Sequence, residues 1–147
     1  MQIIRTTSEN PDFLQLVKEL DCYLATRNGE SDAFFAQFNK VDLLQHVVVV
    51  YQDKQVVGCG AMKDQEGKME LKRMFVPEKF RNQGIASKIL KELESWAKEI
   101  GYNRTILETG KHMEDAVGLY QKNGYQIILN YGQYADVESS VCMEKIL

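Results

Sequence analysis

The chain has 147 residues, of which 44% are hydrophobic and 27% charged, with a formal net charge of −3. This composition is that of a soluble globular protein, and we expect one domain over residues 1–147. No apolar run approaches the roughly 18 residues that cross a bilayer, and the N-terminus lacks the layout of a secretory signal. A membrane protein and a secreted protein are therefore not expected. The charges form no basic face, which argues against a nucleic-acid partner.

The three cysteines, Cys22, Cys59 and Cys142, are odd in number and lack the spacing of metal ligands. We expect them to be buried and reduced, which predicts a cytoplasmic protein without a bound metal. Acidic side chains outnumber basic ones in residues 1–45. That excess favours a cationic partner or, more simply, a solvated helical face.

Periodicity and turn signals divide the chain into strands and helices. The elements expected in chain order are a strand at 1–6, helices at 11–28 and 32–44, a hairpin of strands at 46–52 and 56–63, a strand at 69–76, a helix at 84–100, a strand at 104–109, a helix at 113–123, a strand at 125–130, an irregular loop at 131–139 and a strand at 140–147. The strand–helix–strand order from 69 to 109 predicts a crossover and therefore a parallel pair of strands. The strand at 46–52 is too apolar to face water, so it should lie inside the sheet.

Two features of the first half leave alternatives open. The aromatic residues of helix 32–44, Phe34, Phe35 and Phe38, either join the core or form the wall of a substrate pocket. Gly58 and Gly60 weaken the interior of a strand, so they indicate a bulge or the close approach of another group.

The start of the helix at 84–100 is the feature most informative about function. The segment from Arg81 to Lys88 reads RNQGIASK and contains two cations and no acid. A helix N-terminus usually carries Asp or Glu, because its free N–H groups and partial positive charge favour an anion. The amides of this helix start are therefore available to an external anion, and phosphate fits best.

Two sequence patterns connect this helix start with a later helix. Residues 81–86 match Arg/Gln-x-x-Gly-x-Gly/Ala, and the helix at 113–123 carries Ala116, Leu119 and Tyr120 before Gly124-Tyr125. With the order of elements over the whole chain, these patterns resemble the GNAT superfamily of acetyl-CoA-dependent N-acetyltransferases. The resemblance implies an α/β fold: a mixed, mostly antiparallel central sheet, splayed at a parallel strand pair and flanked by helices.

The resemblance also implies where acetyl-CoA binds. The pyrophosphate would lie on the amides that follow Arg81, with Arg81 or Lys88 pairing with phosphate oxygens, and the pantetheine arm would pair with the end of strand 69–76. The residues expected to bind the cosubstrate are Met74, Phe75, Val76, Arg81, Asn82, Gln83, Gly84, Ile85, Ala86 and Ser87. Many relatives carry Asn where this chain has Met113, so that contact with the cofactor arm differs here.

The resemblance supplies candidates for the catalytic groups. Relatives place a tyrosine hydroxyl near the sulfur, which makes Tyr120 the candidate general acid, although its helical spacing also suits a core residue. Glu70 is the first candidate for the base and Glu108 the second, the alternative for Glu70 being a surface residue of a strand. His46 and His112 are weaker candidates, since one begins a strand and the other lies in a loop.

The expected function is transfer of an acetyl group to a primary amine of a small molecule or peptide, by direct attack in a ternary complex. The alternatives are a non-catalytic acyl-CoA-binding or regulatory module of the same fold and an unrelated α/β nucleotide binder. A polyamine, an amino sugar, an amino acid or a protein amine would each suit the acceptor site, formed by the two N-terminal helices and the loop at 131–139. A homodimer is the alternative to a monomer.

Overall fold

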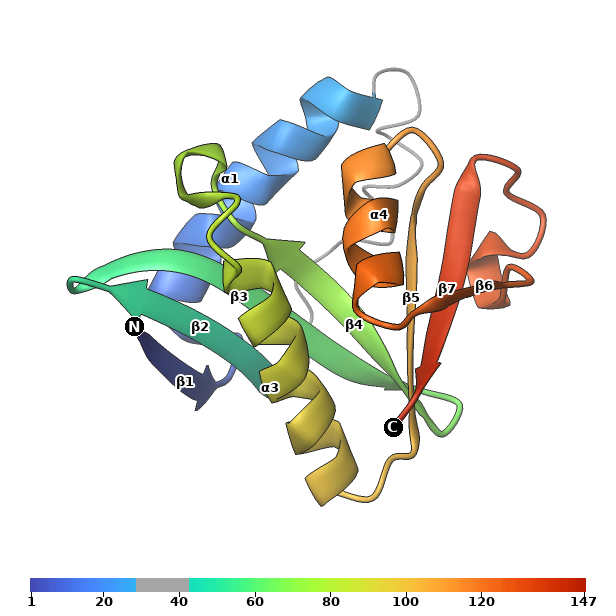
Figure 1. Cartoon of the computed structure of the whole chain (residues 1–147), viewed down its shortest axis with the longest axis horizontal. Coiled ribbons are helices and arrows are strands. Elements are labelled where there is room, and N and C mark those ends of the chain that lie inside the picture. The colour runs from blue at the N-terminus through green and yellow to red at the C-terminus, as the bar shows by residue number, and fades with distance from the viewer. Residues whose placement is uncertain (29–42) are drawn as a thin grey trace.

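The computed structural model describes residues 1–28 and 43–147, in which a seven-stranded sheet carries helices on both faces (Figure 1). The elements are β1 Gln2–Thr6, α1 Pro11–Asn28, β2 His46–Gln52, β3 Gln55–Gln65, β4 Lys68–Phe75, the 3₁₀ turn η2 Glu78–Phe80, α3 Ile85–Glu99, β5 Arg104–Gly110, α4 Glu114–Lys122, β6 Gln126–Ile128, the 3₁₀ turn η3 Gly132–Tyr134 and β7 Ser140–Ile146. The strand order is β1-β2-β3-β4-β5-β7-β6, antiparallel except for the pair β4–β5. The predicted mixed sheet with a parallel pair is confirmed.

The two faces of the sheet have separate cores. Along β2, Val47 and Val49 pack with Phe13 and its neighbours on α1, whereas Val48 and Val50 pack with the apolar face of α3. Successive side chains of a strand point to opposite faces, so a strand covered on both sides needs apolar residues throughout. This double burial explains the run of valines, and β2 lies between β1 and β3 as predicted.

The glycines of β3 allow α3 to lie close to the sheet. A Cβ added to Gly58 would lie 3.0 Å from Ile89 Cδ1, and one added to Gly60 would lie 2.7 Å from Ile89 Cγ2. β3 also carries an extra residue beside Gly58, because Val50 of β2 pairs with Gly58 and Tyr51 with Val56. Both explanations offered for these glycines, a bulge and a close approach, are therefore confirmed.

The later elements follow the prediction with small differences. The strand expected at 125–130 is reduced to β6, and the loop at 131–139 contains the short turn η3. Gly101, with a φ of 101°, follows the end of α3 as the expected left-handed cap. The helix predicted at 32–44 lies almost entirely outside the described residues, so both alternatives for its aromatic residues still stand.

One expectation about the cysteines is wrong. Cys59 and Cys142 are buried, but Cys22 lies on the exposed side of α1. Its helical position turns it away from the face formed by Phe13, Leu16 and Leu20.

No described helix is long and apolar enough to cross a bilayer.

Candidate active site

β4 and β5 diverge soon after they meet (Figure 1). The two strands are paired only at Met69 opposite Thr105 and at Glu70 opposite Ile106. A cavity of about 580 Å³ opens beyond this point and is lined by parts of α1, β4, β5, α4, η3 and the start of α3. Since β5 does not cover the C-terminal half of β4, the backbone of that half can pair with a ligand in the cavity.

A bulge in β4 turns the end of the strand. Ala61 pairs with Lys72 and Cys59 with Phe75, so β4 carries an extra residue in this interval. Arg73 lies there with a φ of 56°, and its side chain forms an ion pair with Asp21 of α1 at 2.6 Å. Nothing in the sequence marked this position, because arginine rarely adopts a positive φ.

The start of α3 offers unoccupied amides to the cavity. Gly84 is the N-cap residue with a φ of 78°, and no side chain caps the helix. The first turn contains no acid, and a Cβ added to Gly84 would have no heavy atom within 4 Å. Asn82, Gly84, Ile85, Ala86 and Ser87 all line the cavity. Their arrangement suits an anion with several oxygens.

The cations of this segment lie apart from one another. Arg81 borders the cavity, donates from Nε to the Val76 carbonyl at 2.8 Å, and covers the ring of Tyr23 with its guanidinium at 4.8 Å. Lys88 instead lies near Met1, with Nζ 3.6 Å from the sulfur. Neither Lys88 nor Gln83 is among the residues that line the cavity.

Tyr120 lines the cavity from α4, on the other side from β4. Its side chain is buried, and burial raises the pKa of the phenol above its ordinary value. Within residues 1–28 and 43–147 its hydroxyl has no hydrogen-bond partner. The phenol is therefore protonated at neutral pH. Met113, at the N-cap of the same helix, also borders the cavity.

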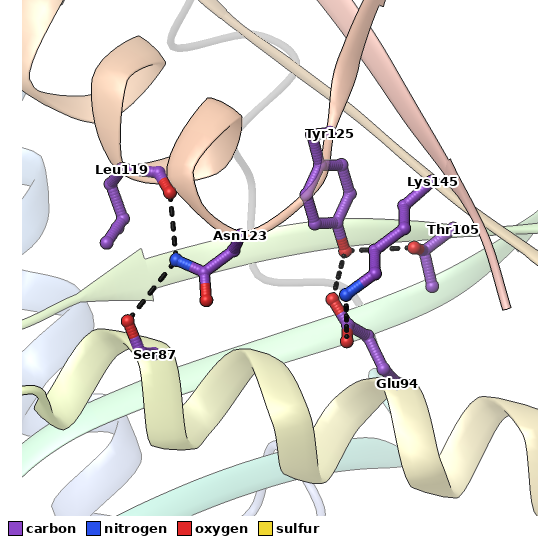
Figure 2. A network of polar contacts seen from close by, with 7 residues as sticks. All are labelled: Ser87, Glu94, Thr105, Leu119, Asn123, Tyr125 and Lys145. Carbon is purple, nitrogen blue, oxygen red and sulfur yellow. Dashed lines mark hydrogen bonds and ion pairs between the residues drawn. The ribbon is translucent and has the colours of Figure 1, made fainter.

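A buried polar network holds α3 against the strands and the end of α4 (Figure 2). Tyr125 donates to Glu94 Oε2 at 2.9 Å, and its hydroxyl lies 2.9 Å from that of Thr105. Lys145 pairs with the other oxygen of Glu94 at 2.9 Å. The network leaves no buried charge uncompensated at this junction, as burial of a carboxylate requires.

Both candidate bases lie at the end of the cavity where the strands part. Glu70 is 3% exposed and accepts a hydrogen bond from Tyr131 at 2.5 Å, so it is not a surface residue. Glu108 accepts from Ser140 Oγ at 2.7 Å. Burial is the largest cause that raises the pKa of Glu108, and the neighbouring Glu70 raises it further.

The structure adds residues that the sequence patterns missed. Those that line the cavity are Leu20, Tyr23, Leu24, Leu71, Lys72, Arg73, Phe80, Leu107, Thr109, Gly110, Asp115, Lys122 and Tyr134. His46 packs against Trp96 with the ring centroids 4.8 Å apart, and neither it nor His112 lines the cavity. Among residues 1–28 and 43–147, no group of three His, Cys, Asp or Glu side chains could hold a metal ion.

The comparisons agree with this geometry. The sequence model of the Acetyltransferase (GNAT) family matches residues 13–125. An Azospirillum brasilense protein named IAA acetyltransferase is 34% identical over 91% of this chain and 90% of its own. A Klebsiella pneumoniae protein that carries an acyl-CoA N-acyltransferase assignment has a TM-score of 0.82 at 29% identity, covering 99% of this chain and 97% of its own. The chain therefore belongs to the GNAT acetyltransferase family.

A third neighbour shows the same fold with a ligand bound. It is a GNAT acetyltransferase from Elizabethkingia anophelis with acetyl-CoA bound, at a TM-score of 0.70 and 20% identity. The match covers 99% of this chain and 97% of the neighbour. Identity this low establishes the fold of the present chain and no more.

Proposed function

We propose that the protein is an N-acetyltransferase that moves the acetyl group of acetyl-CoA to a primary amine by direct attack in a ternary complex. The observation that carries this proposal is the cavity where β4 and β5 part, with an unpaired strand end on one side and the acid-free start of α3 at its edge. The acetyl-CoA bound to a neighbour of the same fold supports the choice of donor. Acetyl-CoA would supply the acetyl group as an activated thioester.

The residues present fit a coenzyme A molecule. The amides around Gly84 would bind the pyrophosphate, helped by the positive end of the α3 dipole. The backbone of Met74, Phe75 and Val76 would pair with the amides of the pantetheine arm. An N–H of this strand end would also donate to the thioester carbonyl as negative charge develops on its oxygen.

Arg81 has two roles in this proposal. Its Nε bond to the Val76 carbonyl fixes the turn between β4 and α3, and its remaining N–H groups have no partner among the described residues. They are free to donate to phosphate oxygens. Lys88 and Gln83 would take part only after a change of side-chain conformation, because neither lines the cavity.

The reaction needs a proton acceptor for the amine and a proton donor for the thiolate. An alkyl ammonium has a pKa of about 10.4, so a base must free the nitrogen lone pair before it attacks the carbonyl carbon. Tyr120 would give its proton to the sulfur as the carbon–sulfur bond breaks. Glu70 and Glu108 are the candidate bases, and this proposal leaves the choice between them open.

The acceptor would bind on the α1 side of the cavity, where α1 contributes Leu20, Tyr23 and Leu24. The acids of α1 do not line the cavity: Asp12 accepts from Tyr51, and Asp21 pairs with Arg73. The acids of α1 are therefore no argument for a polycationic acceptor. We keep a small-molecule or peptide amine as the acceptor class.

A release assay tests the proposal. Purified protein is incubated with acetyl-CoA and panels of amines, and free thiol is measured against time. Steady release that depends on one class of amine supports the enzyme, whereas coenzyme A binding without release from any amine supports the non-catalytic module. Calorimetry separates both from a nucleotide binder, since we expect heat of binding with coenzyme A and none with ATP.

A further inference from the structure

The carboxylate oxygens of Glu70 and Glu108 differ in their hydrogen-bond and ion-pair partners. Glu70 Oε2 accepts from the Tyr131 hydroxyl at 2.5 Å, and its Oε1 lies 3.2 Å from Lys72 Nζ. Both oxygens are thus occupied, and the side chain is only 3% exposed. Because Glu70 is almost fully buried, an acceptor ammonium would reach it most directly by displacing Tyr131 or Lys72. Displacement would leave the partly buried Tyr131 hydroxyl or the partly buried Lys72 ammonium without its partner, which is unfavourable.

Glu108 has a free oxygen at the cavity. Its Oε2 accepts from Ser140 Oγ at 2.7 Å, and its Oε1 has no partner among the described residues. It lies on β5 two positions beyond Ile106, the last residue paired with β4, and it lines the cavity. Among the two carboxyl groups, Glu108 is the one that an entering amine can contact without breaking an existing bond.

The groups around Glu108 also favour it as a base. The polar and titratable groups that face it or share its cavity come from several elements. They include Tyr23 from α1, Glu70, Lys72 and Arg73 from β4, Arg81 before α3, Ser140 and Cys142 from β7, Tyr134 from η3, and Asp115, Tyr120 and Lys122 from α4. Burial and the charge of Glu70 raise the pKa of Glu108, while Ser140 and Lys72 lower it, and the net direction is upward. A carboxylate with a raised pKa accepts a proton from an ammonium more readily.

We propose that Glu108 takes the proton of the acceptor amine. Glu70, held by Tyr131 and Lys72, is then a positioning residue whose negative charge acts on Glu108. This inference rests on the proposed function. The ammonium gives one proton to Glu108 Oε1, and the nitrogen lone pair then attacks the thioester carbonyl carbon. The nitrogen loses a second proton as the amide forms. This proton goes to Tyr120, which has given its own proton to the sulfur. Glu108 returns its proton to water after the product leaves.

The test is the pH dependence of kcat/KM for Glu108→Gln and Glu70→Gln, with Glu66→Gln as a matched control in the exposed turn between β3 and β4, which does not line the cavity. The amine used should have a pKa above 9, so that its protonation stays constant over the range measured. We expect Glu108→Gln to lower kcat/KM by about 100-fold. It should also abolish the acidic limb of the pH profile, which is the fall in kcat/KM at low pH as the base becomes protonated. Glu66→Gln should match the unmodified protein.

Glu70→Gln should keep the acidic limb and move it to lower pH. Its carboxylate raises the pKa of Glu108, so its removal lets Glu108 lose its proton at lower pH. A limb that survives in Glu108→Gln and disappears in Glu70→Gln would overturn the assignment. Equal loss of the limb in both variants would overturn it as well.

A second variant and a second measurement guard against a folding defect and against failure of the proposed function. Ser140→Ala keeps Glu108 but removes a bond that stabilises its charged form, so the acidic limb should move to higher pH. An unchanged limb in this variant contradicts the proposal. Carbon NMR titration of labelled glutamate follows Glu108 without turnover. If the protein releases no thiol with any amine, the proposed function fails. If the pKa of Glu108 does not fall in Glu70→Gln, only the proposed effect of Glu70 on Glu108 is refuted.

Discussion

The ring of Tyr125 meets the ring of Tyr120 edge to face, with the centroids 5.7 Å apart. Tyr125 does not line the cavity, but its hydroxyl is bonded to Glu94 of α3 and lies beside Thr105 of β5 (Figure 2). The proposed general acid is thus supported by a residue that is itself fixed to α3 and the sheet. This contact gives a structural reason for the Tyr120 and Gly124-Tyr125 pattern read from the sequence.

Tyr125→Phe should lower stability while leaving the active site in place. The variant keeps the ring contact with Tyr120 and loses the hydrogen bond to Glu94, which still has Lys145. We expect a loss of about 1–2 kcal/mol in the free energy of unfolding, measured by urea denaturation, and a kcat within a factor of about three. Tyr102→Phe, which removes a hydroxyl bonded to the exposed Asp64, is the control and should cost less. Equal losses would mean that burial adds nothing to the network.

Tyr120→Phe should lower kcat by about 100-fold and change the KM for acetyl-CoA by less than about three-fold, because it removes a proton donor and keeps the ring. Steady-state kinetics with a fixed amine measures both constants. Since burial raises the pKa of Tyr120, the unmodified enzyme should show no loss of rate from this group at pH 9. An unchanged kcat in Tyr120→Phe would remove the residue from the mechanism.

Gly84→Ala and Gly101→Ala form a matched pair at the two ends of α3. Both glycines have a positive φ and open space for a Cβ, so each substitution should lower stability by a similar amount, about 1 kcal/mol. Only Gly84 borders the cavity. Calorimetry with coenzyme A should therefore show about ten-fold weaker binding for Gly84→Ala and unchanged binding for Gly101→Ala. Equal affinities in the two variants would place the phosphates elsewhere.

Gly60→Ala should destabilise the fold by about 1–3 kcal/mol, because its Cβ would lie 2.5 Å from Met74 Sδ and 2.7 Å from Ile89 Cγ2. Gly118→Ala is the control, since Gly118 lies within α4 with no heavy atom within 4 Å of an added Cβ. That change should stabilise by about 0.5–1 kcal/mol through helix propensity. Thermal unfolding of the two variants should shift the midpoint in opposite directions, and shifts of the same sign would contradict the packing argument.

Features that depend on neighbouring residues were predicted well from the sequence. The valines of β2 indicated a strand buried on both faces, and the order of β4, α3 and β5 indicated the parallel pair. The acid-free start of α3 was read correctly as an uncapped helix N-terminus. The buried strand and the helix start follow from a few consecutive residues, and the parallel pair follows from the order of three neighbouring elements.

Only the tertiary structure decided the contacts between distant residues. Tyr131 binds Glu70 across 61 positions of sequence, and the bulge at Arg73 depends on how β4 packs against β3 and α1. Sequence patterns could not distinguish an occupied Glu70 from a Glu108 with one free oxygen, since that difference comes from the loop and the strand that fold over them. The sequence by itself thus determined most of the helices and strands and the uncapped, acid-free start of α3. Packing decided which carboxyl group stays accessible, because burial and hydrogen-bond partners are set by residues far apart in the chain.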